Sequence, residues 1–111
     1  MKRLLLKLSF SLFSVSCLAN EGDTDWRNIT GFGCHLMDGT CYINIDGPAV
    51  GPPECLKNDV RFDTANPPNG NTWLSIIELA YATNKRIRLN IIGCYANQVS
   101  YPTFSYGRIE K

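Results

Sequence analysis

Residues 71–91 read NTWLSIIELAYATNKRIRLNI and predict a helix followed directly by a strand. The first half carries apolar residues at the i, i+3, i+4, i+7 and i+8 spacing of a helix with one buried stripe: Trp73, Ile76, Ile77, Ala80 and Tyr81. Asn84 suits the left-handed turn that ends a helix. We therefore expect a helix over 72–83, with Asn71 or Thr72 as its N-cap.

The second half of this stretch changes to a two-residue period. Three apolar residues alternate with polar ones, namely Ile87, Leu89 and Ile91 with Arg86, Arg88 and Asn90. This pattern is typical of a strand with one buried face and one face in water. Gly93 and Cys94 are expected to end it.

Two strands and a turn are predicted toward the N-terminus. Residues 26–36 form an irregular strand that Gly31 and Gly33 would let bend or bulge. The Asp38-Gly39 pair supplies the positive φ angles of a tight hairpin turn. Residues 41–45 then return as a strand with Cys41, Ile43 and Ile45 on one face and Tyr42 and Asn44 on the other.

The remaining segments complete the order of elements. Prolines and glycines make 47–53 a loop, 60–63 form a short strand, and 66–71 are a second loop. A polar loop over 95–102 precedes a last edge strand over 103–109. The order strand, strand, strand, helix, strand, strand is the connectivity of a mostly β, five-stranded OB-fold-like barrel. An open α+β sheet with one helix is the alternative.

The first 19 residues are predicted to be a secretory signal peptide. Lys2, Arg3 and Lys7 precede the apolar run 8–15, and Ala19 is a small residue after which the signal peptide would be cleaved. Residues 20–111 would then be a single domain exported to the periplasm or the medium. The apolar run is too short to cross a membrane, so no membrane insertion is expected. The alternative takes Cys17 as a lipidated first residue.

Four cysteines lie beyond this leader: Cys34, Cys41, Cys55 and Cys94. In an oxidising compartment an even number implies two disulfides, and four cysteines allow three pairings. Loop entropy does not distinguish them. Geometry favours Cys34 with Cys41, which flank the hairpin turn, and Cys55 with Cys94, which would staple the chain around the helix. Cys41 with Cys55 plus Cys34 with Cys94 stays open.

Charge and motifs argue against several functions. Without the three basic residues of the leader, 8 Lys and Arg face 10 Asp and Glu, a net charge of −2. The sole basic cluster, residues 85–88, is expected to be a solvated strand face, so nucleic acid is an unsuitable partner. Zinc is disfavoured because Cys34, His35 and Cys41 lack a close cysteine pair, and no cofactor is expected.

No catalytic arrangement stands out in the sequence. His35 is the single histidine, and neither a G-x-S-x-G elbow nor a catalytic-cysteine context is present. The acidic residues, such as Asp38, Asp59 and Asp63, have no distinguishing setting. We therefore predict a protein that is not an enzyme. A small hydrolase built on His35 or a carboxylate pair is the rival hypothesis.

The C-terminal aromatic residues offer a binding site instead. Tyr95, Asn97, Gln98 and Tyr101 combine aromatic faces with amide groups, which suits a sugar ring or a protein partner. The alternative is that Tyr95 and Tyr101 pack over a loop while Phe104 and Tyr106 complete the barrel.

The segment 41–92 resembles the B subunits of AB5 toxins of the subtilase-cytotoxin and pertussis-like group. The matching pieces are Cys41-Tyr42-Ile43, Cys55, the helix 73–81 and the basic turn 83–88. The chain is also similar to small uncharacterised exported bacterial proteins, through Arg61-Phe62-Asp63, Ala80-Tyr81-Ala82 and cysteines that bracket the helix. The toxin resemblance implies an OB-type barrel, a pentamer that binds cell-surface glycans, and a Cys41–Cys55 pair. The second resemblance implies Cys55–Cys94.

These observations lead to one functional hypothesis and one alternative. The first is an exported, non-enzymatic binding domain that recognises a glycan or receptor, as a toxin B subunit does. The alternative is a periplasmic inhibitor or immunity-type protein that blocks one protein partner by surface contact.

Overall fold

The computed structural model describes residues 22–65 and 69–111. The predicted leader 1–19 and the alternative at Cys17 lie outside the described residues and stay predictions. Within the described ranges, no helix is long and apolar enough to cross a membrane.

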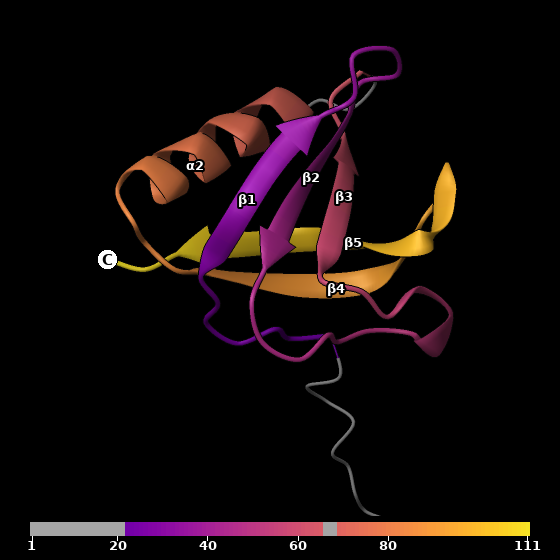
Figure 1. The fold of residues 1–111 in the computed structure, drawn as a ribbon, viewed down its shortest axis with the longest axis horizontal. Coiled ribbons are helices and arrows are strands. Elements are labelled where there is room, and N and C mark those ends of the chain that lie inside the picture. The colour runs from indigo at the N-terminus through magenta and orange to yellow at the C-terminus, as the bar shows by residue number, and fades with distance from the viewer. Residues whose placement is uncertain (1–21, 66–68) are drawn as a thin grey trace, which may run out of the picture.

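The fold is a five-stranded sheet with one α-helix across it (Figure 1). The elements are β1 (Ile29–Cys34), β2 (Thr40–Ile45), the 3-10 turn η2 (Pro53–Cys55), β3 (Asp59–Asp63), α2 (Gly70–Ala82), β4 (Ile87–Tyr95) and β5 (Gln98–Ile109). The predicted mostly β class with one helix, and the predicted order of elements, are confirmed. The strands lie in the order β1-β2-β3-β5-β4.

The first three strands form an antiparallel meander. In β1 the register shifts between Ile29 and Gly31, so the predicted irregular strand is a bulged one. β2 buries Cys41, Ile43 and Ile45, as its alternation predicts. The loop before it is longer than a two-residue turn, because residues 35–39 all lie between the strands and Gly39, with φ 73°, supplies the positive angle.

β5 differs from its prediction in length and in position. It begins at Gln98, directly after a tight turn at Ala96 and Asn97, so most of the expected loop 95–102 is strand. It also lies between β3 and β4 rather than at an edge, with Arg61 opposite Thr103 in parallel register. Pro102 argues against an inner strand at this place in the sequence, because proline cannot donate a backbone hydrogen bond to a neighbouring strand. Here it pairs with Cys94 next to a shift in register.

The helix begins two residues earlier than predicted. Asn69 is the N-cap, and its side chain makes no capping hydrogen bond, whereas the expected caps Asn71 and Thr72 lie inside the first turn. Gly70 is buried against β3: a Cβ there would lie 2.2 Å from the Asp63 carbonyl oxygen. Only glycine therefore fits at this position. Asn84 ends it in the predicted left-handed conformation, with φ 58°.

One side of α2 packs onto the sheet. Ile77 and Ala80 are buried, and Trp73 lies edge-on against Phe104 with ring centroids 5.1 Å apart. Tyr81, expected in the buried stripe, is 48% exposed, and its ring lies edge-on against Phe32 of β1 at the edge of the sheet. The core consists of Cys41, Ile43, Ile45, Val60, Phe62, Ile77, Ile87, Leu89 and Ile91.

The segment 22–27 lies along the free edge of β4. Single antiparallel bridges join Asp23 to Asn90 and Arg27 to Ile87. The Arg27 guanidinium is buried and donates to the Thr24 carbonyl at 2.6 Å and to the Asp46 carbonyl at 2.6 Å. The expected strand 26–36 is therefore interrupted at Asn28: Arg27 pairs with Ile87 of β4, and Ile29 pairs with Ile45 of β2.

Both disulfides favoured by geometry are confirmed. Cys34 and Cys41 are opposite one another on β1 and β2 and are bonded. Cys55, in η2, is bonded to Cys94 on β4, with 5.6 Å between the Cα atoms. The Cys41–Cys55 pair implied by the toxin resemblance is therefore wrong for this chain.

Candidate functional site

The loop over residues 35–39, here called the tip loop, joins β1 to β2 at one end of the sheet (Figure 1). The Cys34–Cys41 disulfide closes its base. Within the loop the His35 amide donates to the Thr40 carbonyl at 2.7 Å, and the Thr40 amide donates to Asp38 Oδ1 at 3.0 Å. This last hydrogen bond is the main cause of a lowered pKa for the Asp38 carboxyl.

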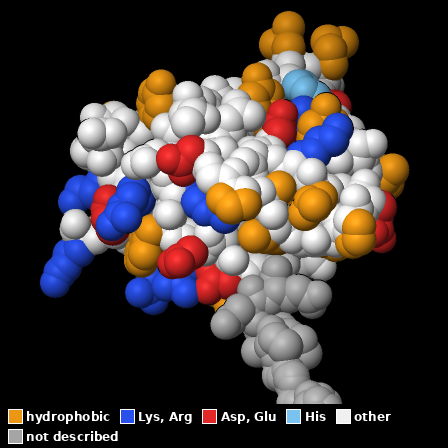
Figure 2. Space-filling view, turned by 60° about the horizontal axis from the view of Figure 1, so that its bottom comes forward, with side chains coloured by type: hydrophobic (Ala, Val, Ile, Leu, Met, Phe, Trp, Pro, Cys, Tyr) orange, Lys and Arg blue, Asp and Glu red, His pale blue; other side chains and the backbone are white. Residues whose placement is uncertain are grey.

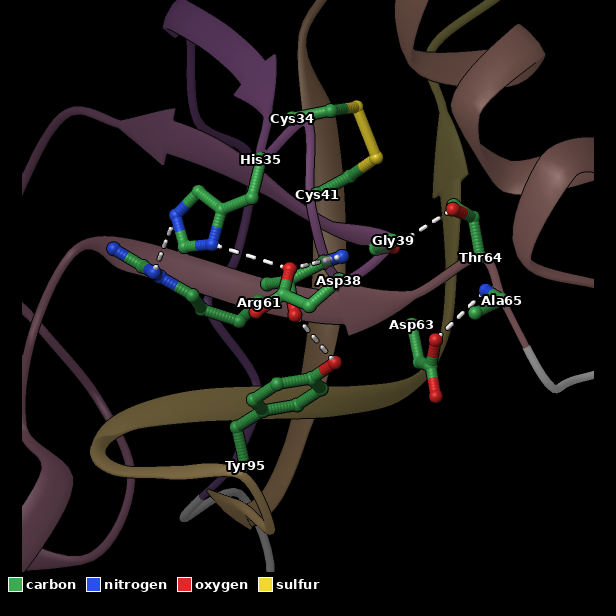
Figure 3. Close-up of a disulfide and its surroundings, with 11 residues drawn as sticks. Cys34, His35, Asp38, Gly39, Cys41, Arg61, Asp63, Thr64, Ala65 and Tyr95 are labelled. Atoms are coloured by element: carbon green, nitrogen blue, oxygen red, sulfur yellow. Dashed lines mark hydrogen bonds and ion pairs between the residues drawn. A yellow bond between two sulfur atoms is a disulfide. The ribbon is translucent and has the colours of Figure 1, made fainter.

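The segment after β3 holds the same loop from a second side. The Gly39 carbonyl accepts hydrogen bonds from the Thr64 amide at 2.9 Å and from Thr64 Oγ1 at 2.7 Å (Figure 3). A Cβ at Gly39 would lie 2.7 Å from the Ala65 Cβ, so only glycine fits this contact. Beneath the loop, the buried Thr40 hydroxyl is hydrogen-bonded to the Tyr95 hydroxyl at 3.0 Å. The base of the tip loop is therefore fixed by three separate parts of the chain.

The apex of the loop is apolar and lies in water. Leu36 is 97% exposed and Met37 is 90% exposed. Figure 2 shows hydrophobic side chains that project from the end of the molecule where this loop lies. The sequence contained the signal, since two large apolar residues inside a turn are unusual, but a turn prediction gives no measure of exposure.

Arg61 lies next to the tip loop on the outer side of the sheet, where its neighbours leave its side chain only 9% exposed. It lies on β3 opposite Tyr42 of β2, on the side away from Val60 and Phe62. Its guanidinium carbon is 3.8 Å from the ring centroid of Tyr101 and 5.2 Å from that of Tyr42. Stacking of a guanidinium between aromatic rings is a favourable cation–π arrangement.

Hydrogen bonds fix the orientation of this guanidinium. Its Nε and Nη2 atoms each donate to the Asp59 carboxylate at 3.2 Å, and Nη1 donates to Gln98 Oε1. Lys57 adds a second cation over the Tyr101 ring, 4.5 Å from its centroid. We call Tyr42, Lys57, Arg61, Gln98 and Tyr101 the Arg61 face.

His35, the first residue of the tip loop, links this loop to the Arg61 face (Figure 3). Its Nε2 is 3.3 Å from Arg61 Nη1, and its Nδ1 is 3.4 Å from Asp38 Oδ1. Because a guanidinium can only donate, Nε2 accepts and Nδ1 carries the proton toward Asp38. The apolar tip and the tyrosine–arginine face are therefore parts of one continuous surface.

The four residues expected to bind a ligand have different positions. Gln98 and Tyr101 meet at Arg61, and Asn97 is exposed in the turn between β4 and β5. Tyr95 is buried beneath the tip loop, with its hydroxyl on Thr40. Tyr42, Lys57 and Arg61 were missed. The two-residue period of their strands predicts that Tyr42 and Arg61 lie on outer faces. Their position beside Tyr101 follows only from the order of the strands in the sheet.

A hollow of about 330 Å³ lies at the other end of β5, lined in part by Asp23, Arg88, Asn90, Tyr106 and Arg108. Arg88 forms two hydrogen bonds with the Asp23 carboxylate, which lower the pKa of Asp23 to about 2. Trp26 lies beside the hollow, with the guanidinium carbons of Arg88 and Arg108 5.9 and 5.6 Å from its ring centroid.

The predicted basic cluster is largely ion-paired. Arg86 donates to the Glu110 carboxylate at 2.9 and 3.0 Å, which raises the pKa of Arg86 and lowers that of Glu110. Arg88 is held by Asp23 in the same way. These pairs leave little uncompensated positive charge along β4.

The structure and the comparisons add two negative findings. Within residues 22–65 and 69–111, no group of three or more His, Cys, Asp or Glu side chains is placed to hold a metal ion. No protein family, no curated protein and no solved structure matches this chain.

Proposed function

We propose that the protein is an exported, non-enzymatic binding domain that recognises a protein partner through the Arg61 face. The observation that carries this proposal is the Arg61 guanidinium, stacked between Tyr42 and Tyr101 and oriented by Asp59 and Gln98. Tyrosine is enriched at the energetic centres of protein interfaces. The buried Arg61 guanidinium holds the partly exposed rings of Tyr42 and Tyr101 in place. Here both are already held in one geometry, so little side-chain entropy is lost when a partner binds.

The proposed architecture is an OB-type barrel. Its support is the strand order β1-β2-β3-β5-β4, the parallel pairing of β3 with β5, and the bridges that join the segment 22–27 to β4. OB folds bind ligands on the face of their second and third strands and on the loops after the first and fourth. In the Arg61 face, Tyr42 and Arg61 lie on β2 and β3, and Gln98 and Tyr101 lie at the start of β5, directly after the β4–β5 turn.

Export is supported by the two disulfides. Disulfides persist in oxidising compartments and are rare in the cytosol. The signal-peptide pattern in residues 1–19 points the same way. We therefore propose that the protein works in the periplasm or the medium.

A role in binding rather than catalysis is supported by the surroundings of His35. One ring nitrogen faces the Asp38 carboxylate and the other faces the Arg61 guanidinium. A general base needs a nitrogen within hydrogen-bond reach of a nucleophile or a substrate proton. Both nitrogens are instead used to join the tip loop to the Arg61 face.

A glycan-binding function is the second candidate, and the hollow beside β5 favours it. Tyr106 is exposed there next to Asn90 and Arg108, which provide an amide and a cation. An aromatic face beside polar groups is a suitable platform for a sugar ring. The pentameric, toxin-like form of this function is part of the same second candidate.

One pair of matched variants tests the two candidates. The purified exported domain is used to capture protein from the cell envelope and medium of the organism that makes it, and is applied to a glycan array. Tyr101→Ala should weaken binding of the captured protein about 10-fold or more, while Tyr106→Ala, on the same strand, should not.

The glycan candidate predicts the reverse dependence. Glycan retention would be lost in Tyr106→Ala and kept in Tyr101→Ala, and native mass would show whether five copies assemble. Binding that survives both substitutions would refute both assignments.

A further inference from the structure

Leu36 and Met37 form the most exposed apolar pair in the described parts of the chain. The next most exposed large hydrophobic residue, Val99, is 66% exposed. Full burial of a side chain of this size contributes about 1.5–3 kcal/mol, and here almost none of it is gained on folding. A polar pair would serve the turn equally well, so the fold itself does not explain these residues.

The loop presents this pair in a fixed position. The Cys34–Cys41 disulfide, the Asp38–Thr40 hydrogen bond and the two hydrogen bonds from Thr64 all hold the base of the loop. None of these contacts buries the two apolar side chains. Such an arrangement lowers the entropy lost on association, because the backbone is ordered before the partner arrives.

We propose that Leu36 and Met37 are an anchor that inserts into an apolar pocket of a folded protein partner. This inference rests on the proposed function and names the contact that adds to the Arg61 face. His35 makes the two surfaces continuous. An apolar anchor bordered by polar and aromatic groups is the usual composition of a protein interface, in which a few central residues provide most of the affinity.

Charge favours a protein over a lipid surface as the occupant. Loops that dock on membranes carry Lys and Arg beside their apolar residues, because the headgroups are anionic. Here the charged residue directly beside the apolar pair is Asp38. Its carboxylate would be repelled by an anionic bilayer.

The conformation of the apex also excludes two other modes of recognition. Residues 36–38 form a turn and not an extended segment. They therefore cannot add a strand to the partner's sheet, and they do not present the extended backbone of a protease substrate. What the turn offers is two side chains that project from a rigid support.

Photo-cross-linking identifies the occupant. Photo-leucine replaces Leu36 in the exported full-length domain, which is irradiated with the envelope and medium fractions of its own organism. The proposal expects one cross-linked protein, with the label on apolar residues of a pocket. A cross-link to phospholipid or to a second copy of this chain overturns it, as does flotation with vesicles of phosphatidylcholine and phosphatidylglycerol.

Calorimetry with the identified protein then measures the anchor. The double variant Leu36→Ser/Met37→Ser should bind at least about 30-fold more weakly, and the control Val99→Ser should stay within about 2-fold of wild type. Thermal melting checks that the double variant is folded. If it keeps full affinity while Tyr101→Ala loses it, the anchor is refuted and the proposed function stands. If both variants keep full affinity, both ideas fail.

Discussion

The two disulfides are expected to stabilise the domain by different amounts, because they close loops of different length. Cys55 and Cys94 are 39 positions apart, whereas Cys34 and Cys41 are 7 apart. The chain-entropy relation assigns about 4 kcal/mol to the longer loop and about 2.5 kcal/mol to the shorter one. We expect Cys55→Ala/Cys94→Ala to lower the free energy of unfolding more than Cys34→Ala/Cys41→Ala, by about 1.4 kcal/mol.

Packing effects are matched between the two pairs. Each pair has one fully buried partner, Cys55 or Cys41, and one partner with access to solvent. Substitution by alanine therefore leaves a small buried void in both variants, and the void term largely cancels in the difference. The remaining difference between the two variants in lost free energy of unfolding therefore measures the chain entropy of the unfolded state.

The assay is urea unfolding of the three oxidised proteins at one temperature. A domain of this size has about 5–15 kcal/mol of stability in total, so a loss of about 4 kcal/mol is easily resolved. It corresponds to a melting temperature lower by roughly 15–30 °C. If the Cys34–Cys41 variant loses as much as the Cys55–Cys94 variant, contacts in the folded tip loop outweigh chain entropy and the reasoning is wrong.

Two further substitutions test local features of the fold. Arg88→Gln should raise the pKa of Asp23 from about 2 toward its ordinary 3.8 in an NMR titration, whereas Arg86→Gln should leave it unchanged. In the wild type, the stability from this ion pair is full above pH 4 and is lost as the pH falls toward 2. Gly39→Ala should destabilise by about 1–3 kcal/mol in urea, because φ is 73° and the new Cβ meets Ala65. Gly31→Ala, where the nearest atom is 3.4 Å away, is the matched control, and equal losses in both would contradict the argument.

The elements that were predictable from sequence have a strong period of their own. The alternation of Ile87, Leu89 and Ile91 and the helical spacing from Trp73 to Ala80 depend only on neighbours along the chain. The Cys34–Cys41 pair belongs to the same class, because a hairpin places its flanking residues opposite one another.

The structural features that the sequence did not predict depend on contacts between distant segments. The position of β5 between β3 and β4 cannot be read from its own residues, and Pro102 argues locally against a strand. The helix begins at Gly70, where a Cβ would lie 2.2 Å from the Asp63 carbonyl oxygen, and this contact with β3 has no local signature. The capping residues alone predict a start two residues later.

The Arg61 face combines both kinds of information. Periodicity alone places Tyr42 and Arg61 on outer faces, and composition alone points to Gln98 and Tyr101, but only the parallel pairing of β3 with β5 unites them. The short disulfide has the same double character, since it contributes the smaller share of stability while it closes the loop that carries Leu36 and Met37. Besides its share of stability, this crosslink holds the base of the loop that carries the two most exposed apolar side chains in the described residues, which is consistent with a role in recognition.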